Sequence, residues 1–314
     1  MSPLNLDQIL AVPQAPPNFR SGFVAIIGRP NVGKSTLLNA LVGQKIAITS
    51  PVAQTTRNRL QGIVTTPACQ MILVDTPGIH KPHHELGRIL VQNAKRAIHS
   101  VDVVVLLVDS CVPLGRGDQF IVDLLSQHTA PVLVGLNKQD QQDPKQADGL
   151  DQSYDVLTEN YGWPTWKFSA LTGKGLPMLQ QALTEKLPPG PYYYPPDLVT
   201  DQPERFIMAE LIREQILRLT RQEVPHSVAI AIEKIEETPQ RTNVFAAITV
   251  ERTSQKGIII GQKGTMLQAI GSEARQQIQK LIAGDVYLKL FVKVEPKWRQ
   301  SRAQLLEFGY RVEE

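Results

Sequence analysis

The chain has 314 residues, of which 42% are hydrophobic and 20% are charged, and its formal net charge is +3. This composition is typical of a soluble globular protein that is long enough for two domains. It excludes a membrane-spanning helix, because no apolar run reaches roughly 20 residues, and the start of the chain lacks the pattern of a secretion signal. The two cysteines, Cys69 and Cys111, are too few for a disulfide framework.

In the first part of the chain, apolar runs alternate with helical patterns. Residues 1–20 contain four prolines and predict a flexible arm. After the arm, strands are predicted at 23–28, 71–74, 103–108, 132–136 and 166–168, and helices at 34–42, 85–98, 118–127, 146–161 and 176–187. This alternation predicts an α/β domain with a mostly parallel sheet that is covered on both faces. Residues 60–65 predict an additional, antiparallel strand at its edge.

A proline-rich stretch separates this domain from the rest of the chain. Five prolines between 188 and 196 remove backbone donors, so we place an extended linker at 189–203, between domains at 21–188 and 204–314. Beyond the linker we expect a helix at 204–220, strands at 227–235 and 243–250, a strand-like run at 258–260, a helix to about residue 282 and a strand at 286–294. This order predicts a second, smaller α+β domain.

A glycine loop follows the first predicted strand and precedes the first predicted helix. Gly28, four further residues and then Gly33-Lys34-Ser35 have the spacing and the context of a phosphate-binding loop. Lys34 is expected between the β- and γ-phosphates, and Ser35 is expected to give Mg²⁺ its hydroxyl. A plain glycine turn before a helix is the alternative. The predicted phosphate cradle consists of Gly28, Arg29, Pro30, Asn31, Val32, Gly33, Lys34, Ser35 and Thr36.

A second motif, Asp75-Thr76-Pro77-Gly78, ends the strand at 71–74. Asp75 is expected to hold Mg²⁺ through water, and the Gly78 amide is expected to contact the γ-phosphate, so that the loop reports whether this phosphate is present. A strand followed by a Pro-Gly turn is also common without any such role.

Two threonines lie between these motifs, where a switch loop belongs. Thr55 or Thr56 is expected to bind Mg²⁺ through its hydroxyl, and we favour Thr56 because it directly precedes Arg57. An exposed loop threonine is the alternative. The predicted metal ligands are therefore Ser35, Thr56 and Asp75.

Two further motifs predict the base. Asn137-Lys138-Gln139-Asp140 follows the strand at 132–136, and the Asp140 carboxylate can accept hydrogen bonds from N1–H and the N2 amino group of guanine, which adenine does not offer. Lys138 is expected to cover the base, Asn137 to tie this loop to the phosphate loop, and the Ala170 amide to donate to guanine O6. Together with the phosphate cradle, the predicted nucleotide contacts are Asp75, Thr76, Pro77, Gly78, Ile79, Asn137, Lys138, Asp140, Ser169, Ala170 and Leu171.

One catalytic part of Ras-like switches is missing. These carry a water-orienting glutamine directly after the glycine of the second motif, and here that position is Ile79. We therefore expect slow intrinsic GTP hydrolysis that needs external help. As a hypothesis, Asn31 helps to hold a monovalent cation, K⁺, near the phosphates. The predicted catalytic residues are Lys34, Asn31 and Gly78.

The second half contains its own glycine loop, Gly261-Gln262-Lys263-Gly264. Two glycines let the backbone approach a nucleic-acid strand closely, and Lys263 adds charge. From Lys256 to Arg302 there are nine Lys and Arg against three acidic residues. An ordinary turn with a solvated basic face is the alternative. The predicted RNA contacts are Ile260, Gly261, Gln262, Lys263, Gly264 and Arg275.

Taken together, the motifs resemble the Era GTPase family. The resemblance rests on 28–36, 54–57, 75–78, 137–140 and 169–170 in the first half and on 260–264 with 270–275 in the second, and it covers nearly the whole chain after about Arg20. It implies a P-loop GTPase domain joined to a type II KH domain. It also implies binding of small-subunit ribosomal RNA near its 3′ end, a role in small-subunit assembly, and a cytoplasmic protein with loose association to the inner face of the membrane. We expect a monomer.

Two other functions remain open from the sequence. A P-loop kinase or ATPase is disfavoured by Asp140 and by the lack of a phosphoacceptor pocket. An RNA-binding adaptor with a nucleotide-binding but catalytically weak GTPase domain is compatible with Ile79.

Overall fold

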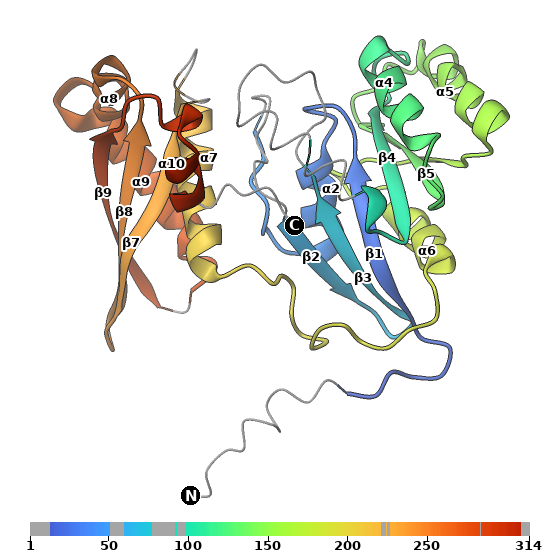
Figure 1. Cartoon of the computed structure of the whole chain (residues 1–314), viewed down its shortest axis with the longest axis horizontal. Coiled ribbons are helices and arrows are strands. Elements are labelled where there is room, and N and C mark those ends of the chain that lie inside the picture. Colours follow the sequence, from blue (N-terminus) through green and yellow to red (C-terminus); the bar gives the residue numbers. More distant parts are fainter. Residues whose placement is uncertain are drawn as a thin grey trace, which may run out of the picture. The chain divides into compact units, whose positions relative to one another are not determined.

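The structure is a computed structural model that describes residues 13–50, 60–76, 92, 98–220, 224, 227–282 and 284–308. The chain forms two compact units (Figure 1). The first comprises Met1–Ile46, Arg59–His80 and Val91–Asp201, and the second comprises Ala47–Asn58, Lys81–Leu90 and Gln202–Glu314. Each unit is described by itself below.

The first unit is built on a six-stranded sheet in the order β2-β3-β1-β4-β5-β6. All neighbouring pairs are parallel except β2 with β3, which is the antiparallel edge that the sequence predicts. Helices follow or connect the strands. The elements are β1 (Arg20–Ile27), α2 (Lys34–Val42), β2 (Leu60–Thr65), β3 (Cys69–Asp75), β4 (Val103–Asp109), α4 (Arg116–Leu125), β5 (Val132–Asn137), α5 (Ala147–Tyr161), β6 (Thr165–Lys167) and α6 (Leu176–Lys186).

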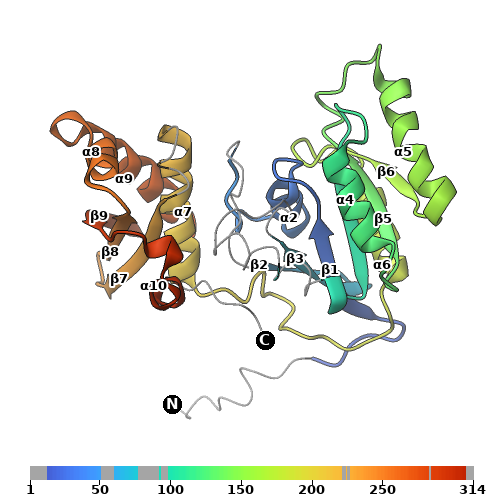
Figure 2. The same ribbon diagram turned by 45° about the horizontal axis from the view of Figure 1, so that its top comes forward.

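The two faces of this sheet carry different helices. On one face, an apolar cluster joins alternate residues of β1, β4 and β5 to α4 and α5. On the other face, Gly62 of β2 lies against Leu38 of α2, and Cys69 of β3 contacts Thr184 of α6. Figure 2 shows α2 and α4 on opposite sides of β1. A buried parallel sheet of this kind fixes the positions of the loops at its carboxyl edge.

The register of the strands decides which polar side chains meet at that edge. Gly62 pairs with Leu73, so Asp75, two residues further along β3, lies on the α2 face. The same face continues through β1 to β4 and β5, where it includes the paired residues Asp109 and Asn137. Three strand-terminal polar residues are therefore directed toward the side on which α2 begins.

The segment after α6 runs along the first unit. The backbone N–H groups of Tyr193 and Tyr194 donate to Gln70 Oε1 at 2.7 and 3.0 Å, and Tyr194 donates through its hydroxyl to Gln61. The ring of Tyr192 lies 4.4 Å from that of Phe19. The tyrosines between the prolines thus pack against this unit. The helix that we predict at 85–98 falls outside the described residues except for positions 92 and 98.

The second unit has a three-stranded sheet in the order β7-β8-β9, in which β7 and β8 are antiparallel and β8 and β9 are parallel. Helix α7 packs on β7 and α9, and α9 packs on β9. Its elements are α7 (Glu204–Leu219), β7 (Ala229–Glu237), β8 (Arg241–Val250), α8 (Thr253–Ile260), η2 (Gln262–Gly264), α9 (Thr265–Ile278), β9 (Asp285–Val294), η3 (Trp298–Gln300) and α10 (Arg302–Glu307).

The strand-like run predicted at 258–260 is wrong, because these residues end helix α8. Gln255 Oε1 accepts hydrogen bonds from the backbone N–H groups of Glu251 and Arg252, and this closes the first turn of the helix. Helical spacing buries Ile259 completely and leaves Ile258 exposed. Among the described residues, the order of α-helices and strands in this unit is therefore α-β-β-α-α-β-α, and α8 and α10 are the helices that the sequence does not predict. In the described part of the chain, no helix is both long and apolar enough to span a membrane.

Candidate functional site

The loop between β1 and α2 is shaped as a cradle for an anion. Gly33 has φ 102°, and a Cβ at this position would lie 2.4 Å from Asn137 Nδ2, so only glycine fits. Helix α2 begins at Lys34 with no side-chain cap and no acidic residue in its first turn. This end of the helix therefore presents N–H groups and a positive dipole without an acidic residue in its own first turn, which suits a phosphate.

Lys34 is held inside this loop. Its side chain is buried, and Nζ donates to the carbonyl oxygens of Gly28 and Arg29 at 3.2 and 3.0 Å. Burial lowers the pKa of Lys34 to about 8, and the negative charge of Asp75 opposes this shift. The ammonium is thus placed among carbonyl groups at the base of the cradle, where an arriving phosphate would stabilise its charge.

Ser35 and Asp75 form an oxygen pair beside the cradle. Ser35 Oγ donates to Asp75 Oδ2 at 2.7 Å, and Asp75 is fully buried at the end of β3. A hydroxyl and a carboxylate are the hard oxygen donors that Mg²⁺ prefers, and Mg²⁺ usually completes its coordination with water and substrate phosphates. The residues that are present therefore fit the predicted metal.

The rest of the second motif is only partly described. The Thr76 hydroxyl donates to the Ile26 carbonyl oxygen at 3.0 Å in a buried contact, so this side chain ties the end of β3 to β1. Five residues for which we predict roles near the phosphate lie outside the described residues. They are Thr55, Thr56, Pro77, Gly78 and Ile79.

Asn137 connects three loops of the site. Its Nδ2 donates to the Val32 carbonyl oxygen at 2.8 Å, which is the tie to the phosphate loop that the sequence predicts. Its Oδ1 accepts the backbone N–H of Ala170 at 2.9 Å. The Ala170 amide, which we predict to donate to guanine O6, therefore already has an acceptor in Asn137. A guanine at this site would have to share that donor.

The base loop places its two charged residues differently. Lys138 has φ 70°, and its Nζ lies 2.6 Å from Asp109 Oδ2, so the side chain is held across the end of β4. Asp140 is exposed, which leaves its carboxylate open to an arriving base. In the neighbouring loop Ser169 Oγ accepts the N–H of Thr172 at 3.1 Å, and Leu171 is 71% exposed.

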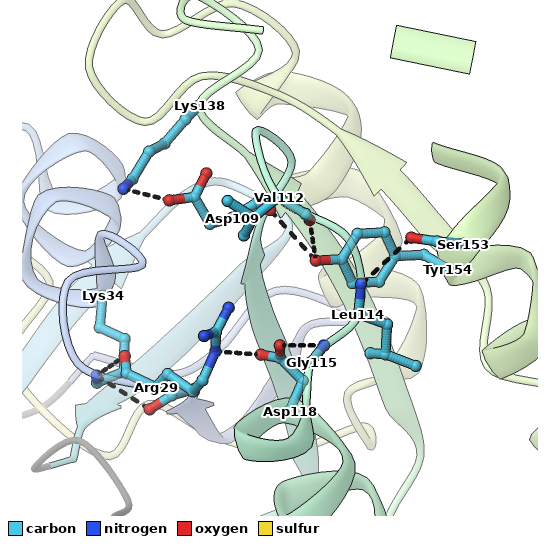
Figure 3. A network of polar contacts seen from close by, with 11 residues as sticks. Arg29, Lys34, Asp109, Val112, Leu114, Gly115, Asp118, Lys138, Ser153 and Tyr154 are labelled. Carbon is cyan, nitrogen blue, oxygen red and sulfur yellow. Dashed lines mark hydrogen bonds and ion pairs between the residues drawn. The ribbon is translucent and has the colours of Figure 1, made fainter. Parts of the chain in front are cut away.

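A polar network around the site was missed by the sequence motifs (Figure 3). Arg29 Nε lies 2.7 Å from Asp118 Oδ1, and Asp118 Oδ2 accepts the N–H of Gly115 at 3.0 Å. The Tyr154 hydroxyl donates to the carbonyl oxygens of Asp109 and Val112, and burial raises the pKa of Tyr154. The ion pair with Asp118 fixes Arg29 of the phosphate loop to α4. An acidic residue directly after the apolar run at 103–108 was the signal that could have identified Asp109.

The second unit contains a groove between α9 and the edge strand β9. It has a volume of about 550 Å³. Its walls combine apolar residues with polar and positively charged ones. They consist of Gly264, Leu267, Gln268, Gly271, Ser272 and Arg275 on the helical side and Tyr287, Leu288, Lys289 and Leu290 on the strand. Unpaired backbone groups of an edge strand beside an apolar surface can bind an extended polymer.

The predicted glycine loop lies at one end of this groove. Gly261, Lys263 and Gly264 have φ values of 71°, 51° and 82°, and a Cβ on Gly261 would lie 2.7 Å from Met266 Cβ. Lys263 is exposed at the tip of the loop. Of the six predicted RNA contacts, Gly264 and Arg275 line the groove, and Ile260, Gly261, Gln262 and Lys263 stand in the helix end and loop that lead to it.

Fold and sites together define a P-loop GTPase domain followed by a KH domain. Family models match both parts: "50S ribosome-binding GTPase" matches residues 23–138, and "KH domain" matches residues 223–299. The chain belongs to the Era GTPase family. It is 80% identical over 306 residues to GTPase Era of Synechocystis sp., with 98% of this chain and 97% of the relative covered.

Two solved Era structures are also similar to this chain. One is an Aquifex aeolicus Era variant bound to GDP and AlF4⁻, and the other is Era in complex with MgGDPNP and nucleotides 1506–1542 of 16S ribosomal RNA. Each has a TM-score of 0.89 and 38% sequence identity, with 93% of this chain and 99% of the other chain covered. The chain is accordingly a GTPase with a doubly covered, mostly parallel sheet and a smaller KH domain.

Proposed function

We propose that this chain is a GTP-hydrolysing switch that binds small-subunit ribosomal RNA near its 3′ end and assists assembly of the small ribosomal subunit. The observation that carries the proposal is the occurrence, in one chain, of the cradle tied together by Asn137 and of a groove that ends in a glycine loop. The Era relative in complex with MgGDPNP and 16S ribosomal RNA supports both halves.

In this proposal each residue of the nucleotide site has a defined task. The backbone N–H groups of the cradle and Lys34 hold the β- and γ-phosphates, because both are directed into the same loop. Asp140 accepts from N1–H and the N2 amino group of guanine, and Lys138, held by Asp109, covers the base. Asn137 keeps the base loop and the phosphate loop in one register.

Ser35, Asp75 and Thr56 would hold Mg²⁺ in this site. When bound, the ion neutralises charge on the β- and γ-phosphate oxygens. Asp75 is well suited to this role because it is buried and already in contact with the Ser35 hydroxyl. The Gly78 amide would sense the terminal phosphate in the loop that follows.

Slow intrinsic hydrolysis follows from Ile79, which cannot orient a water molecule. Asn31, exposed at φ 66° in the cradle, would help to hold K⁺ beside the phosphates. Phosphate release measured in K⁺ and in Na⁺, for the unaltered chain and for Asn31→Ala, tests this. Equal turnover in both salts and in both proteins would contradict the role of K⁺.

The RNA half of the proposal assigns the domain at 204–314 to single-stranded RNA. The loop at 260–264 would approach the sugar–phosphate backbone, and Arg275 would contact phosphate from the wall of the groove.

We also propose the division of the chain into an arm at 1–20, a GTPase domain at 21–188 and a linker at 189–203. A cytoplasmic, monomeric protein with peripheral membrane contact rests on the family resemblance alone.

The decisive experiment measures GTP affinity and turnover with and without an RNA that contains the 3′ end of small-subunit ribosomal RNA. Coupling is reciprocal, so RNA should tighten GTP binding or accelerate hydrolysis. Identical affinity and turnover would defeat the switch. If RNA binds but the chain releases no phosphate over many turnovers, the adaptor with a weak GTPase domain replaces the switch.

A further inference from the structure

The sheet of the second unit has a face that is turned away from its helices. On β9, Leu290 lies against α9, since a Cβ on Gly271 would be 3.5 Å from Leu290 Cδ1. Successive side chains of a strand alternate between faces, so Tyr287, Lys289 and Phe291 are directed to the opposite side. Tyr287 is 43% exposed and Phe291 is 39% exposed. Two large aromatic side chains therefore stand in solvent on one strand.

The neighbouring strand extends this surface. In the register of β8 with β9, Phe245 pairs with Lys289, so its half-buried ring lies on the same face. Arg241, four residues earlier on β8, shares that face and is exposed. We call this set the aromatic–basic strip. It consists of Arg241, Phe245, Tyr287, Lys289 and Phe291.

Cations lie directly on the rings of the strip. Arg241 Cζ is 5.0 Å from the centroid of the Tyr287 ring, and Lys289 Nζ is 5.2 Å from that of Phe291. Within the described residues, Arg241 and Lys289 have no carboxylate partner. The nearby lysines of this sheet differ, because Lys234 pairs with Glu236 and Lys293 with Glu233. The strip therefore keeps its positive charge.

The strip is continuous with the groove. Tyr287 and Lys289 line the groove as well as belonging to the strip, whereas Arg241, Phe245 and Phe291 lie only on the strip. A chain that leaves the groove over the edge of β9 would meet the rings next. Tyr287 and Phe291 are four residues apart, which places them about 13 Å from each other along the strand. That distance leaves room for two separate stacking positions.

We propose that the aromatic–basic strip binds the nucleotides that flank those held in the groove. Bases stack on Tyr287 and Phe291, and phosphates meet Arg241 and Lys289, which is the arrangement by which proteins hold single-stranded nucleic acid with little sequence preference. An apolar protein partner would bury both cations without a counter-charge, at a high desolvation cost. This inference rests on the proposed RNA-binding function and adds a second surface to it.

The test uses the full chain with GDPNP and two kinds of RNA probe. The long probe is the segment corresponding to nucleotides 1506–1542 of 16S ribosomal RNA. The short probe is the tightest binder among overlapping fragments of it of about five nucleotides, a length that fills a KH groove. Phe291→Ala should weaken the long probe by about tenfold and leave the short probe within about twofold of the unaltered chain.

Matched variants separate the strip from other effects. Phe120→Ala removes a phenylalanine that is 51% exposed on α4 of the first unit, so it is more exposed than Phe291, and the change should affect neither probe. Arg241→Gln should weaken the long probe and lower the slope of its salt dependence by about one unit. Phe291→Leu keeps an apolar side chain and removes the ring, so it gives the same answer if Phe291→Ala fails to fold.

The possible outcomes separate a failure of the proposed RNA-binding function from a failure of the aromatic–basic strip. If the unaltered chain binds neither probe, the proposed RNA-binding function fails. If it binds both and Lys263→Glu weakens both, but Phe291→Leu and Arg241→Gln bind the long probe normally, the strip is overturned and the function stands. Unchanged RNA binding with an altered sedimentation coefficient in Phe291→Ala would overturn the proposal in favour of a contact between copies of the chain.

Discussion

The two glycine loops of this chain place their lysines in opposite surroundings. Lys34 is 7% exposed and lies against backbone carbonyl groups, whereas Lys263 stands in solvent at the tip of its loop. Both loops end in a left-handed glycine, Gly33 or Gly264, that precedes a helix. Similar local geometry thus serves an enclosed site at the edge of a buried parallel sheet and an open surface between two partly exposed helices. The surroundings, rather than the glycines, decide which ligand fits.

Lys34→Ala tests the enclosed member of this pair and has the largest expected effect. Removing a buried ammonium that we propose to contact phosphate should lower GTP affinity by about 100-fold or more and abolish multiple-turnover phosphate release. The measurements are equilibrium binding of a fluorescent GTP analogue and a phosphate-release assay. Lys263→Ala is the control and should behave as the unaltered chain in both. Normal phosphate release by Lys34→Ala would remove this lysine from the active site.

Asp140→Asn tests whether the enclosed site also selects its base. An asparagine offers a donor where guanine needs an acceptor, so the preference for GTP over xanthosine triphosphate should fall by about 100-fold. Competition binding with the two nucleotides measures this. Asp143→Asn, an exposed carboxylate close by in the same loop region, should leave the preference unchanged. Equal shifts in both variants would indicate a general charge effect.

Lys263→Glu tests the open member of the pair. Reversing a charge at the tip of the loop should weaken RNA binding by about tenfold and leave GTP affinity unchanged, because this lysine belongs to the second unit. Filter binding or anisotropy with the long RNA measures it. The control is Lys174→Glu, an exposed lysine of the first unit. Loss of GTP binding in Lys263→Glu would show that the assignment of domains is wrong.

The sequence was sufficient to predict sites that are formed by residues adjacent in the chain. It did not predict the contacts between residues that lie far apart in the chain and meet only through the packing of helices and the register of strands. The cradle was predictable because Gly33, Lys34 and Ser35 follow a strand and begin a helix. Asp118 has no motif and reaches Arg29 only because α4 packs on the sheet beside the cradle. Asp109 meets Lys138 because β4 and β5 end at the same level.

The wrong strand at 258–260 has a similar cause. Three isoleucines in a row favour a strand by propensity, yet one buried face and a closed first turn make them helical. The information lies in Gln255, which caps the helix from within its first turn. The strand propensity of three isoleucines was therefore outweighed by helical contacts with residues three to four positions away in the chain.

The pH dependence of GTP binding sharpens the contrast between the two lysines. Burial lowers the pKa of Lys34 to about 8 in the nucleotide-free protein, and a bound triphosphate should raise it again. Binding above pH 8 then takes up a proton, and GTP affinity should fall by roughly fivefold to tenfold between pH 7.5 and pH 9. Calorimetry in buffers of different ionisation enthalpy measures the uptake.

The same shift predicts how stability changes. Between pH 8 and the ordinary pKa of 10.5, the unfolded chain binds the Lys34 proton and the folded chain does not, so this group adds stability as pH rises through that window. For the proton taken up on GTP binding, Lys34→Arg is the control. The guanidinium does not titrate in this range, so this uptake should disappear in the variant. Uptake that persists in Lys34→Arg would assign it to another group.

Asp118→Asn has the smallest expected effect and asks how much of the enclosed site depends on its surroundings. The carboxylate accepts from Arg29 on one oxygen and from the Gly115 N–H on the other. An asparagine can keep one of these contacts and loses the charge, so we expect KM for GTP to rise by about threefold with kcat unchanged. Steady-state phosphate release measures both constants.

Asp123→Asn supplies the matched comparison, because Asp123 lies on the same helix and accepts an exposed hydrogen bond from Gln119. It should leave KM unchanged. If both variants raise KM equally, the effect comes from the charge of α4 as a whole. If only Asp118→Asn does so, Asp118 affects GTP affinity by holding Arg29 in place. Lys263 has no comparable supporting contact among the described contacts of its exposed loop. The rise in KM would then measure how much α4, a helix that contains none of the motifs, contributes to GTP binding by holding the phosphate loop.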